Sequence, residues 1–210
     1  MQTRGILTVI SGFAGTGKGT VVKGIMEKYD DYALSVSMTT RSPRPGETDG
    51  ESYFFVSREE FEKNIAEDGF IEYAEYVGNY YGTPKAYVEK KLDEGKNVIL
   101  EIEIQGAMNV KKLFPDAVLI FIMPPGADEL ERRLSGRGTE TAEVIKKRMD
   151  RAALESEGIE DYDYIAVNDN VDDCVEAVNG IIRATRLKPA FNTSFIEKVR
   201  NDLKEKARRN

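Results

Sequence analysis

Short apolar runs alternate along this chain with stretches in which apolar residues recur every three or four positions. The runs predict buried strands, and the stretches predict amphipathic helices. Strands are expected near 6–11, 32–37, 97–104, 117–123 and 163–168. Helices are expected near 17–29, 84–95, 106–113, 126–135, 140–157 and 171–187. This alternation predicts an α/β fold of three layers, in which a mainly parallel central sheet carries helices on both faces.

The pattern changes between residues 38 and 83. A turn rich in proline and charge, 41–47, precedes strand-like pieces at 52–56 and 70–77, which a short helix near 57–67 separates. This segment predicts an inserted, mixed or largely antiparallel subdomain. A second candidate for movement is the loop 135–140, where glycines flank Arg137. Such a loop can swing a positive charge over a site, so we interpret it as a small lid.

A glycine-rich turn follows the first predicted strand. It reads Gly12-Phe13-Ala14-Gly15-Thr16-Gly17-Lys18-Gly19-Thr20. Glycines let backbone N–H groups face an anion, the following helix adds a partial positive charge at its N-terminus, and Lys18 adds a full one. Strand, turn and helix together predict a P-loop that binds phosphates. Gly19 stands where a magnesium-binding Ser or Thr usually follows the lysine, so Mg²⁺ is expected to arrive with the nucleotide and to keep most of its waters.

Composition excludes several kinds of chemistry. The 210 residues contain no histidine and a single cysteine, Cys174, which excludes a His-based triad, a Cys/His zinc site and a disulfide within the chain. Cys174 lies in a helical pattern and is expected to be buried. The longest apolar run, 117–123, is too short to cross a membrane, and residues 1–5 lack the apolar core of a signal peptide. A net charge of −7 argues against general nucleic-acid binding. These features favour a cytoplasmic protein with no membrane or nucleic-acid partner.

The C-terminal segment differs from the rest of the chain. Residues 183–210 hold nine Lys/Arg and three Asp/Glu, a local charge of +6. A basic helix is expected over 191–210, and its single apolar stripe consists of Phe191, Phe195, Ile196, Val199 and Leu203. The favoured interpretation is that this stripe packs onto the body of the protein. A contact between copies, or weak binding to polyanions, is the alternative, and the chain is expected to be a monomer or a homo-oligomer.

Two groups of arginines lie outside the P-loop. Arg41 and Arg44 belong to the inserted segment, and the second group surrounds the glycine-flanked loop at Arg133, Arg137 and Arg148. Phosphoryl transfer requires opposed phosphates that are held in line and neutralised, and guanidinium groups suit both tasks. The two groups therefore predict two phosphate-bearing substrates. An acceptor that is itself a phosphate needs no strong base, which fits the absence of histidine.

Several motifs resemble those of the guanylate kinase family, in the family's order, over about residues 5 to 185. They stand at 35–47, 50–56, 70–74, 78–83, 103–106, 137–140 and 167–169. The resemblance implies a P-loop core over 1–37, 84–134 and 158–190, a GMP-binding insert over 38–83 and a lid over 135–157, with 191–210 as an additional helix. It also implies transfer of phosphate from ATP, which carries Mg²⁺, to GMP.

The resemblance further implies roles for individual residues. The GMP phosphate would be held by Ser37, Arg41, Arg44, Tyr53 and Tyr81. Guanine would be read by Glu72, Thr83 and Glu103. The transferring phosphoryl group would be stabilised by Lys18, Arg41, Arg137 and Arg148. ATP would be bound by the P-loop residues 12–20 together with Arg133, Arg137 and Asn168. Apart from the resemblance, an acid on a strand near a P-loop often orients magnesium-bound water, which makes Glu101, with Thr20, a candidate for this role without a direct protein ligand.

The chemistry of guanine supports the roles given to Glu72 and Glu103. Guanine presents adjacent N–H donors that carboxylates accept, whereas adenine presents an acceptor at N1, so such a site discriminates strongly. Glu103 lies within the apolar run 98–104 and is expected in a buried strand. The family usually has Asp at this position.

Three other interpretations stay open at this point. Adenylate kinase shares Gly-Lys-Gly-Thr, although its Asp-Gly-(Phe/Tyr)-Pro-Arg stretch is absent here. A catalytically inactive guanylate-kinase-like scaffold would typically lack the P-loop that this chain retains. An unrelated P-loop regulator would carry its arginines only on the surface. ADP formation with GMP, AMP, dTMP or no acceptor separates these possibilities.

Overall fold

The computed structural model describes residues 4–76, 78–136 and 141–209. Its central sheet is five-stranded and parallel, in the order β2-β7-β1-β8-β9. The strands are β1 (Leu7–Gly12), β2 (Tyr32–Leu34), β7 (Asn97–Glu101), β8 (Val118–Met123) and β9 (Tyr164–Val167). The predicted α/β class is therefore confirmed, and β1 occupies the middle of the sheet.

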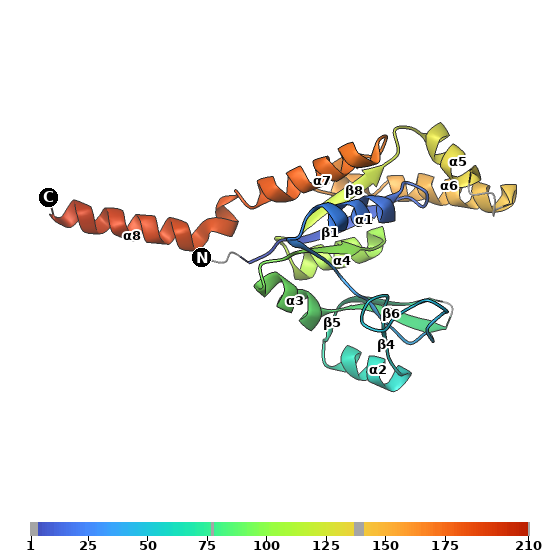
Figure 1. The fold of residues 1–210 in the computed structure, drawn as a ribbon, viewed down its shortest axis with the longest axis horizontal. Coiled ribbons are helices and arrows are strands. Elements are labelled where there is room, and N and C mark those ends of the chain that lie inside the picture. The colour runs from blue at the N-terminus through green and yellow to red at the C-terminus, as the bar shows by residue number, and fades with distance from the viewer. Residues whose placement is uncertain (1–3, 77, 137–140, 210) are drawn as a thin grey trace.

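Helices cover both faces of this sheet (Figure 1). Adjacent residues of β1 point to opposite faces: Val9 packs in the core beneath one helix layer and Ile10 beneath the other. The first layer is α3 (Lys85–Asp93), α4 (Ile104–Leu113), α5 (Ala127–Ser135) and α6 (Ala142–Ser156). The second is α1 (Lys18–Lys28) and α7 (Val171–Thr185). Cys174 is buried in α7, and burial raises the pKa of its thiol to about 11.

A second, four-stranded sheet of order β4-β3-β6-β5 lies beside the first (Figure 1). Its strands are β3 (Met38–Thr39), β4 (Phe54–Phe55), β5 (Phe70–Tyr76) and β6 (Asn79–Pro84), with α2 (Arg58–Ala66) between β4 and β5. β5 and β6 are antiparallel, whereas β3 and β4 are parallel, so the sheet is mixed. Phe61 of α2 anchors this unit by stacking on Phe70 and Tyr80, at centroid distances of 4.3 and 5.1 Å.

Four strands differ from the sequence expectation. β6 and β3 lie outside the expected apolar runs, because pairing with neighbouring strands, rather than an apolar sequence, holds them. β2 ends at Leu34 instead of residue 37. β7 ends at Glu101, and the chain then turns into α4 with Glu103 as its N-cap residue. The expectation that Glu103 lies in a buried strand is wrong, since its side chain is 73% exposed.

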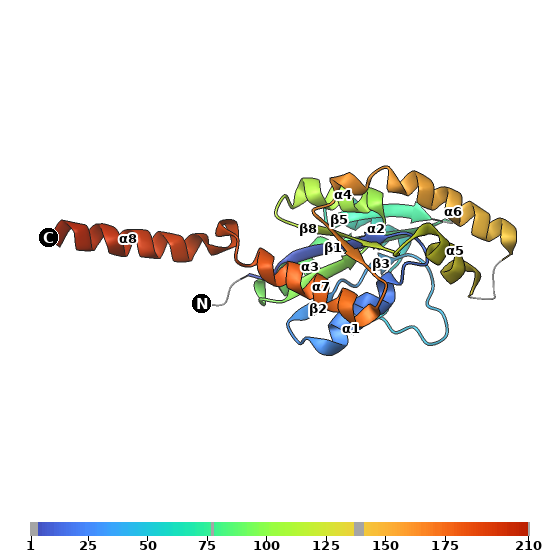
Figure 2. The ribbon, with the colours of Figure 1, turned by 90° about the horizontal axis from the view of Figure 1, so that it is seen from above.

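The expected packing of the C-terminal stripe onto the body holds for Phe191, which packs against the core beneath α1 and α7, but is wrong for the part of the stripe on the last helix. The helix α8 (Thr193–Arg209) projects away from the body along the long axis of the molecule, and none of its residues is buried (Figures 1 and 2). A 3₁₀ turn at Pro189–Asn192 redirects the chain. The Asn192 amide stabilises this turn by donating to the carbonyl oxygens of Arg186 and Lys188, at 2.7 and 2.9 Å.

Within residues 4–76, 78–136 and 141–209, no helix is both long enough and apolar enough to cross a membrane.

A buried asparagine joins the start of the central sheet to the end of α7. Asn97 is fully buried at the first position of β7. Its Oδ1 accepts hydrogen bonds from the backbone N–H of Ile6 (3.2 Å) and from the Arg186 guanidinium (2.7 Å). Its amide nitrogen donates to the Asp31 carboxylate at 3.1 Å.

We predict that Asn97→Ala lowers the free energy of unfolding by about 2 kcal/mol, because it leaves the buried N–H of Ile6 without its side-chain acceptor. Urea denaturation followed by circular dichroism measures this change. The control is Asn201→Ala on the exposed α8, which should shift the free energy of unfolding by less than about 0.5 kcal/mol. Equal midpoints for the two variants would contradict the structural role of Asn97.

Candidate functional site

The glycine-rich turn lies at the carboxyl end of β1, the edge at which parallel sheets of this kind bind ligands. Gly17 immediately precedes α1 and has a φ of 85°, in the left-handed region that favours glycine. A Cβ added there would lie 2.6 Å from the Asn168 side-chain nitrogen. Gly17 is therefore required both for the backbone conformation and for the close approach of Asn168.

Lys18 is positioned by the turn itself. Its ammonium donates to the carbonyl oxygens of Gly12 and Phe13, at 2.6 and 3.1 Å. A Cβ atom built on Gly19 would lie 3.8 Å from both carboxylate oxygens of Glu101, so this carboxylate faces the same turn. Desolvation by the surrounding protein raises the pKa of the Glu101 carboxyl, and the positive charge of Lys18 only partly offsets this rise.

The other predicted P-loop residues divide between core and surface. Phe13 is buried and packs edge-on against Phe121, with ring centroids 5.0 Å apart. Thr16 is also buried, and its hydroxyl donates to the Phe13 carbonyl at 2.9 Å. Ala14 and Thr20 are exposed. The buried residues fix the shape of the turn, and the exposed ones leave its outer surface open.

Asn168 and Arg133, both predicted for the ATP side, contact the backbone of this turn. The Asn168 amide donates to the Thr16 carbonyl at 2.7 Å, and an Arg133 nitrogen lies 3.5 Å from the same oxygen. Arg133 also donates to Glu129 at 2.6 Å. Hydrogen bonds from Arg132 and Arg133 lower the pKa of Glu129 to about 2. The sequence analysis missed Glu129, although its spacing of four residues from Arg133 on a helix is a recognisable signal.

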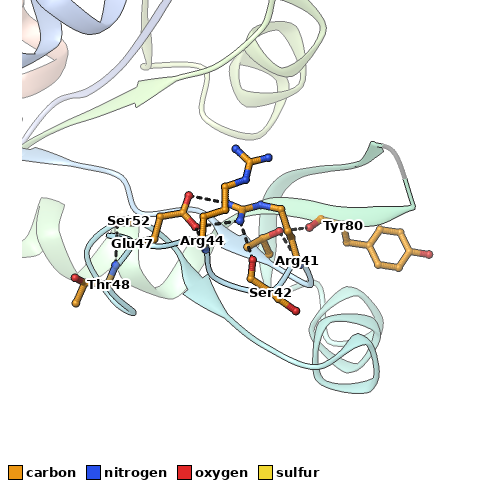
Figure 3. Close-up of polar contacts among 8 residues, drawn as sticks. Arg41, Ser42, Arg44, Glu47, Thr48, Ser52 and Tyr80 are labelled. Atoms are coloured by element: carbon orange, nitrogen blue, oxygen red, sulfur yellow. Dashed lines mark hydrogen bonds and ion pairs between the residues drawn. The ribbon is translucent and has the colours of Figure 1, made fainter.

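On the second sheet, Arg41 is aligned by a carboxylate that the sequence analysis did not single out. Its guanidinium donates to both oxygens of Glu47, at 2.8 and 3.0 Å (Figure 3). It also lies over the Tyr53 ring, 5.3 Å from the centroid. The backbone N–H of Arg44 donates to Glu47 at 2.7 Å, while the Arg44 side chain points away from the Arg41–Glu47 pair (Figure 3). The Arg41 hydrogen bond lowers the pKa of Glu47.

A cavity of about 150 Å³ lies between the two sheets. Residues from both sides line it, including Tyr53 and Thr83 from the segment 38–83, Ser37 just before that segment, and Glu101 from the central sheet. Tyr81 borders Tyr53, with ring centroids 6.1 Å apart. Residues predicted for the phosphate acceptor and the P-loop neighbour Glu101 thus share one cavity.

Glu72 and Thr83 form a cross-strand pair behind this cavity. They are partners in the register of β5 and β6, and the Thr83 hydroxyl donates to Glu72 at 2.7 Å. Burial raises the pKa of the Glu72 carboxyl, and the Thr83 hydrogen bond lowers it. A Cβ added at Gly106, in the first turn of α4, would lie 3.6 Å from the other Glu72 oxygen.

Glu103 has a different environment from Glu72. Its carboxylate accepts a hydrogen bond from Arg151 of α6 at 2.6 Å, and Arg151 also donates to Glu155 at 2.7 Å. Arg148 lies one turn earlier on the same helix and is half-buried. The predicted residue Arg137 lies outside the described residues. The structure therefore joins Glu103 to the helix of the predicted lid rather than to the cavity.

A parallel sheet, a glycine-rich P-loop turn behind its middle strand, and a second sheet with Arg41 and Arg44 between two of its strands define a P-loop protein of the nucleotide-binding kind. Comparison with known proteins narrows this class. The sequence model for guanylate kinase matches residues 4–185. The chain belongs to the guanylate kinase family.

Individual relatives match over most of their length. A guanylate kinase of Clostridium perfringens is 50% identical over 205 residues, which cover 97% of this chain and 95% of the relative. A guanylate kinase of Streptococcus thermophilus is 55% identical over 189 residues, or 90% of each chain. The crystal structure of guanylate kinase from Anaplasma phagocytophilum is similar with a TM-score of 0.68, at 35% identity and 89% coverage of both chains.

We predict that Gly17→Ala weakens ATP binding about 10-fold or more, because the added methyl group displaces Asn168 from the turn. Isothermal titration with ATP measures the effect. Gly78→Ala is the matched control, since Gly78 also has a positive φ, of 74°, but has nothing within 4 Å of an added Cβ. Both variants carry backbone strain, and only the first should lose affinity. If the two variants bound ATP equally well, the close approach of Asn168 to Gly17 would not be needed for ATP binding.

Proposed function

We propose that this chain transfers the γ-phosphate of ATP to GMP, giving ADP and GDP, in the cavity between the two sheets. Family membership supports the reaction. The observation that carries the residue-level proposal is the buried Glu72–Thr83 pair, because Thr83 and the P-loop neighbour Glu101 line the same cavity. A purine held by this pair would direct its phosphate toward the P-loop.

ATP is proposed to bind along the P-loop, with Lys18 and the backbone N–H groups of residues 12–20 on its phosphates. Arg133 and Asn168 complete this side of the site, where both contact Thr16. The Asn168 Oδ1 atom is buried and has no hydrogen-bond partner among the described atoms. In this proposal the Asn168 oxygen accepts a hydrogen bond from the exocyclic amine of adenine.

The phosphate of GMP is proposed to bind at Ser37, Arg41, Arg44, Tyr53 and Tyr81. Arg41 is already aligned by Glu47 and by the Tyr53 ring, so little side-chain entropy is lost when the phosphate arrives. Glu47 is thus a positioning residue for Arg41. The outward-pointing Arg44 supplies a second cation.

Guanine is proposed to be read by Glu72, Thr83 and Glu103. Ionised carboxylates accept from the N1–H and the exocyclic amine of guanine, and the hydroxyl of Thr83 keeps Glu72 oriented. Glu103 must first leave Arg151. Because both partners of that pair are exposed, at 73% and 67%, their exchange for guanine costs little.

The chemical step requires charge stabilisation rather than a base. An oxygen of the GMP phosphate attacks the γ-phosphorus, the bond to the β–γ bridging oxygen breaks, and the electron pair leaves with ADP. Lys18, Arg41, Arg137 and Arg148 are proposed to neutralise the moving charge. In this proposal the insert 38–83 and the lid 135–157 close over the core formed by 1–37, 84–134 and 158–190, and so exclude water.

Magnesium is proposed to arrive on ATP. Glu101, whose carboxylate faces Gly19, and the exposed Thr20 would hold waters of an ion that is bound mainly by phosphates and water. The ion supplies neutralising charge and aligns the phosphates.

The proposal includes a cytoplasmic location and no membrane or nucleic-acid partner. The single, buried Cys174 suits a reducing compartment. An acidic chain of net charge −7 is repelled by polyanions.

We predict that Lys18→Met lowers kcat about 100- to 1,000-fold while the fold is retained, because one cation that contacts the moving phosphoryl group is lost. A coupled assay of ADP formation with GMP, AMP, dTMP or no acceptor provides the measurement. The control is Lys23→Met, since Lys23 is exposed on the same helix and pairs with Glu27. ADP formation that does not depend on GMP would refute the proposed reaction.

We predict a pH effect that arises from Glu72. Burial raises the pKa of its carboxyl above the ordinary 4.5, so Glu72 takes up a proton at a higher pH than a free carboxyl does. The protonated form can no longer accept both guanine donors. The kcat/KM for GMP should therefore be constant near neutral pH and fall as the pH decreases through this raised pKa.

The variant Glu72→Gln tests this assignment. Its kcat/KM for GMP should be about 30-fold lower near neutral pH, and the acidic decrease should disappear. The KM for ATP, measured in the same buffers, is the internal control and should change little. An unchanged pH profile in the variant would assign the titration to another group.

A further inference from the structure

Helix α5 packs directly against the glycine-rich turn. Two of its leucines, Leu130 and Leu134, lie one helical turn apart and are almost fully buried, at 3% and 1% exposure. A Cβ atom built on Gly15 would lie 2.8 Å from a methyl carbon of Leu134 and 3.4 Å from a methyl carbon of Leu130. These close contacts fix the position of α5 relative to the turn.

The residue before each leucine is charged. Glu129 and Arg133 are also one helical turn apart, and the Arg133 Nε atom donates to the Glu129 carboxylate at 2.6 Å. A terminal nitrogen of Arg133 lies 3.5 Å from the carbonyl oxygen of Thr16 in the turn. The two side chains are only 23% and 21% exposed, so solvent and salt screen this pair less than a surface pair. Glu129 therefore holds Arg133 at the edge of the turn.

A second arginine binds the same carboxylate from the solvent side. The Nε atom and a terminal nitrogen of Arg132 each donate to Glu129 at 2.7 Å, and the Arg132 side chain is 73% exposed. Within the described residues the printed contacts of Arg132 stay on α5, whereas Arg133 also reaches the turn. Hydrogen bonds from the two arginines lower the pKa of Glu129 to about 2, so this carboxylate is ionised near neutral pH.

We propose, on the basis of the proposed ATP site at the P-loop, that Glu129 is a positioning residue for Arg133. An arginine side chain has several rotatable bonds, and ordering them when a ligand arrives reduces the affinity for that ligand. The Glu129 carboxylate orders them before ATP binds, because it fixes the Nε end of the guanidinium while a terminal nitrogen points to Thr16.

The sign of the effect on ATP binding separates positioning from plain charge. Glu129 is an anion beside a site for a polyanion. If it acted only through its charge, its removal would strengthen ATP binding. If it positions Arg133, its removal weakens ATP binding.

Isothermal titration of the full chain with ATP alone tests this proposal, and the measurement does not depend on which acceptor the enzyme uses. Glu129→Ala should weaken ATP binding about 3- to 10-fold, which is the range expected when one flexible side chain must be ordered at binding. The KM for ATP should rise by a similar factor, while the KM for GMP should change less than about 2-fold. Unchanged or stronger ATP binding would overturn the proposal.

A double-mutant cycle tests whether the effect passes through Arg133. Arg133→Ala should also weaken ATP binding, and the double variant Glu129→Ala/Arg133→Ala should bind ATP no more weakly than Arg133→Ala alone. The reason is that the carboxylate then has no Arg133 to position. Losses that add in full would show that Glu129 acts independently of Arg133 and would contradict the proposed role.

The matched control is Arg132→Ala. It removes the other arginine on the same carboxylate, and its dissociation constant for ATP should stay within about 2-fold of that of the unmodified protein. Alanine favours the helix, so circular dichroism should show the same helix content in all of these variants. A loss of ATP affinity in Arg132→Ala as large as that in Glu129→Ala would assign the effect to α5 as a whole and overturn the role of Glu129.

Discussion

The donors gathered behind the end of β1 are the feature on which the rest of the structure depends. β1 lies between two parallel strands, and its fully buried residues fix the turn that follows. Lys18, Asn168 after β9 and Arg133 on α5 all donate to carbonyls of that turn, and the carboxylate of Glu101, at the end of β7, faces it. A concentrated anionic charge can bind only where such groups are already aligned, because reorienting them at binding would consume the free energy gained.

Arginines in this protein are aligned by carboxylates, and burial separates two kinds of pair. Arg41–Glu47 and Arg133–Glu129 are 14–23% exposed at their side chains, whereas Arg151–Glu103 is about 70% exposed on both sides. Solvent weakens an exposed pair far more than a half-buried one. In the proposed site the first two pairs would therefore be fixed parts, and the third, more exposed pair would exchange partners at lower cost.

The two ends of the central sheet have different surroundings. The carboxyl ends carry the P-loop turn and border the cavity between the two sheets, and the amino ends border the apolar groove and the base of α8.

Local sequence determined the central sheet, the P-loop and most helices, because apolar periodicity and glycine-turn chemistry act over a few residues. Motifs in the family's order also pointed to Thr83, which lines the cavity, and to its partner Glu72. Three features did not follow from the sequence pattern: the Asn-Tyr-Tyr strand β6, which also pairs with the distant strand β3; the exposure of Glu103, which is bound by Arg151 48 residues away; and the direction of α8. An amphipathic stripe specifies that a helix needs a partner surface, but only the tertiary structure decides whether that surface belongs to the same chain, because the turn at Pro189–Asn192 sets the helix's direction.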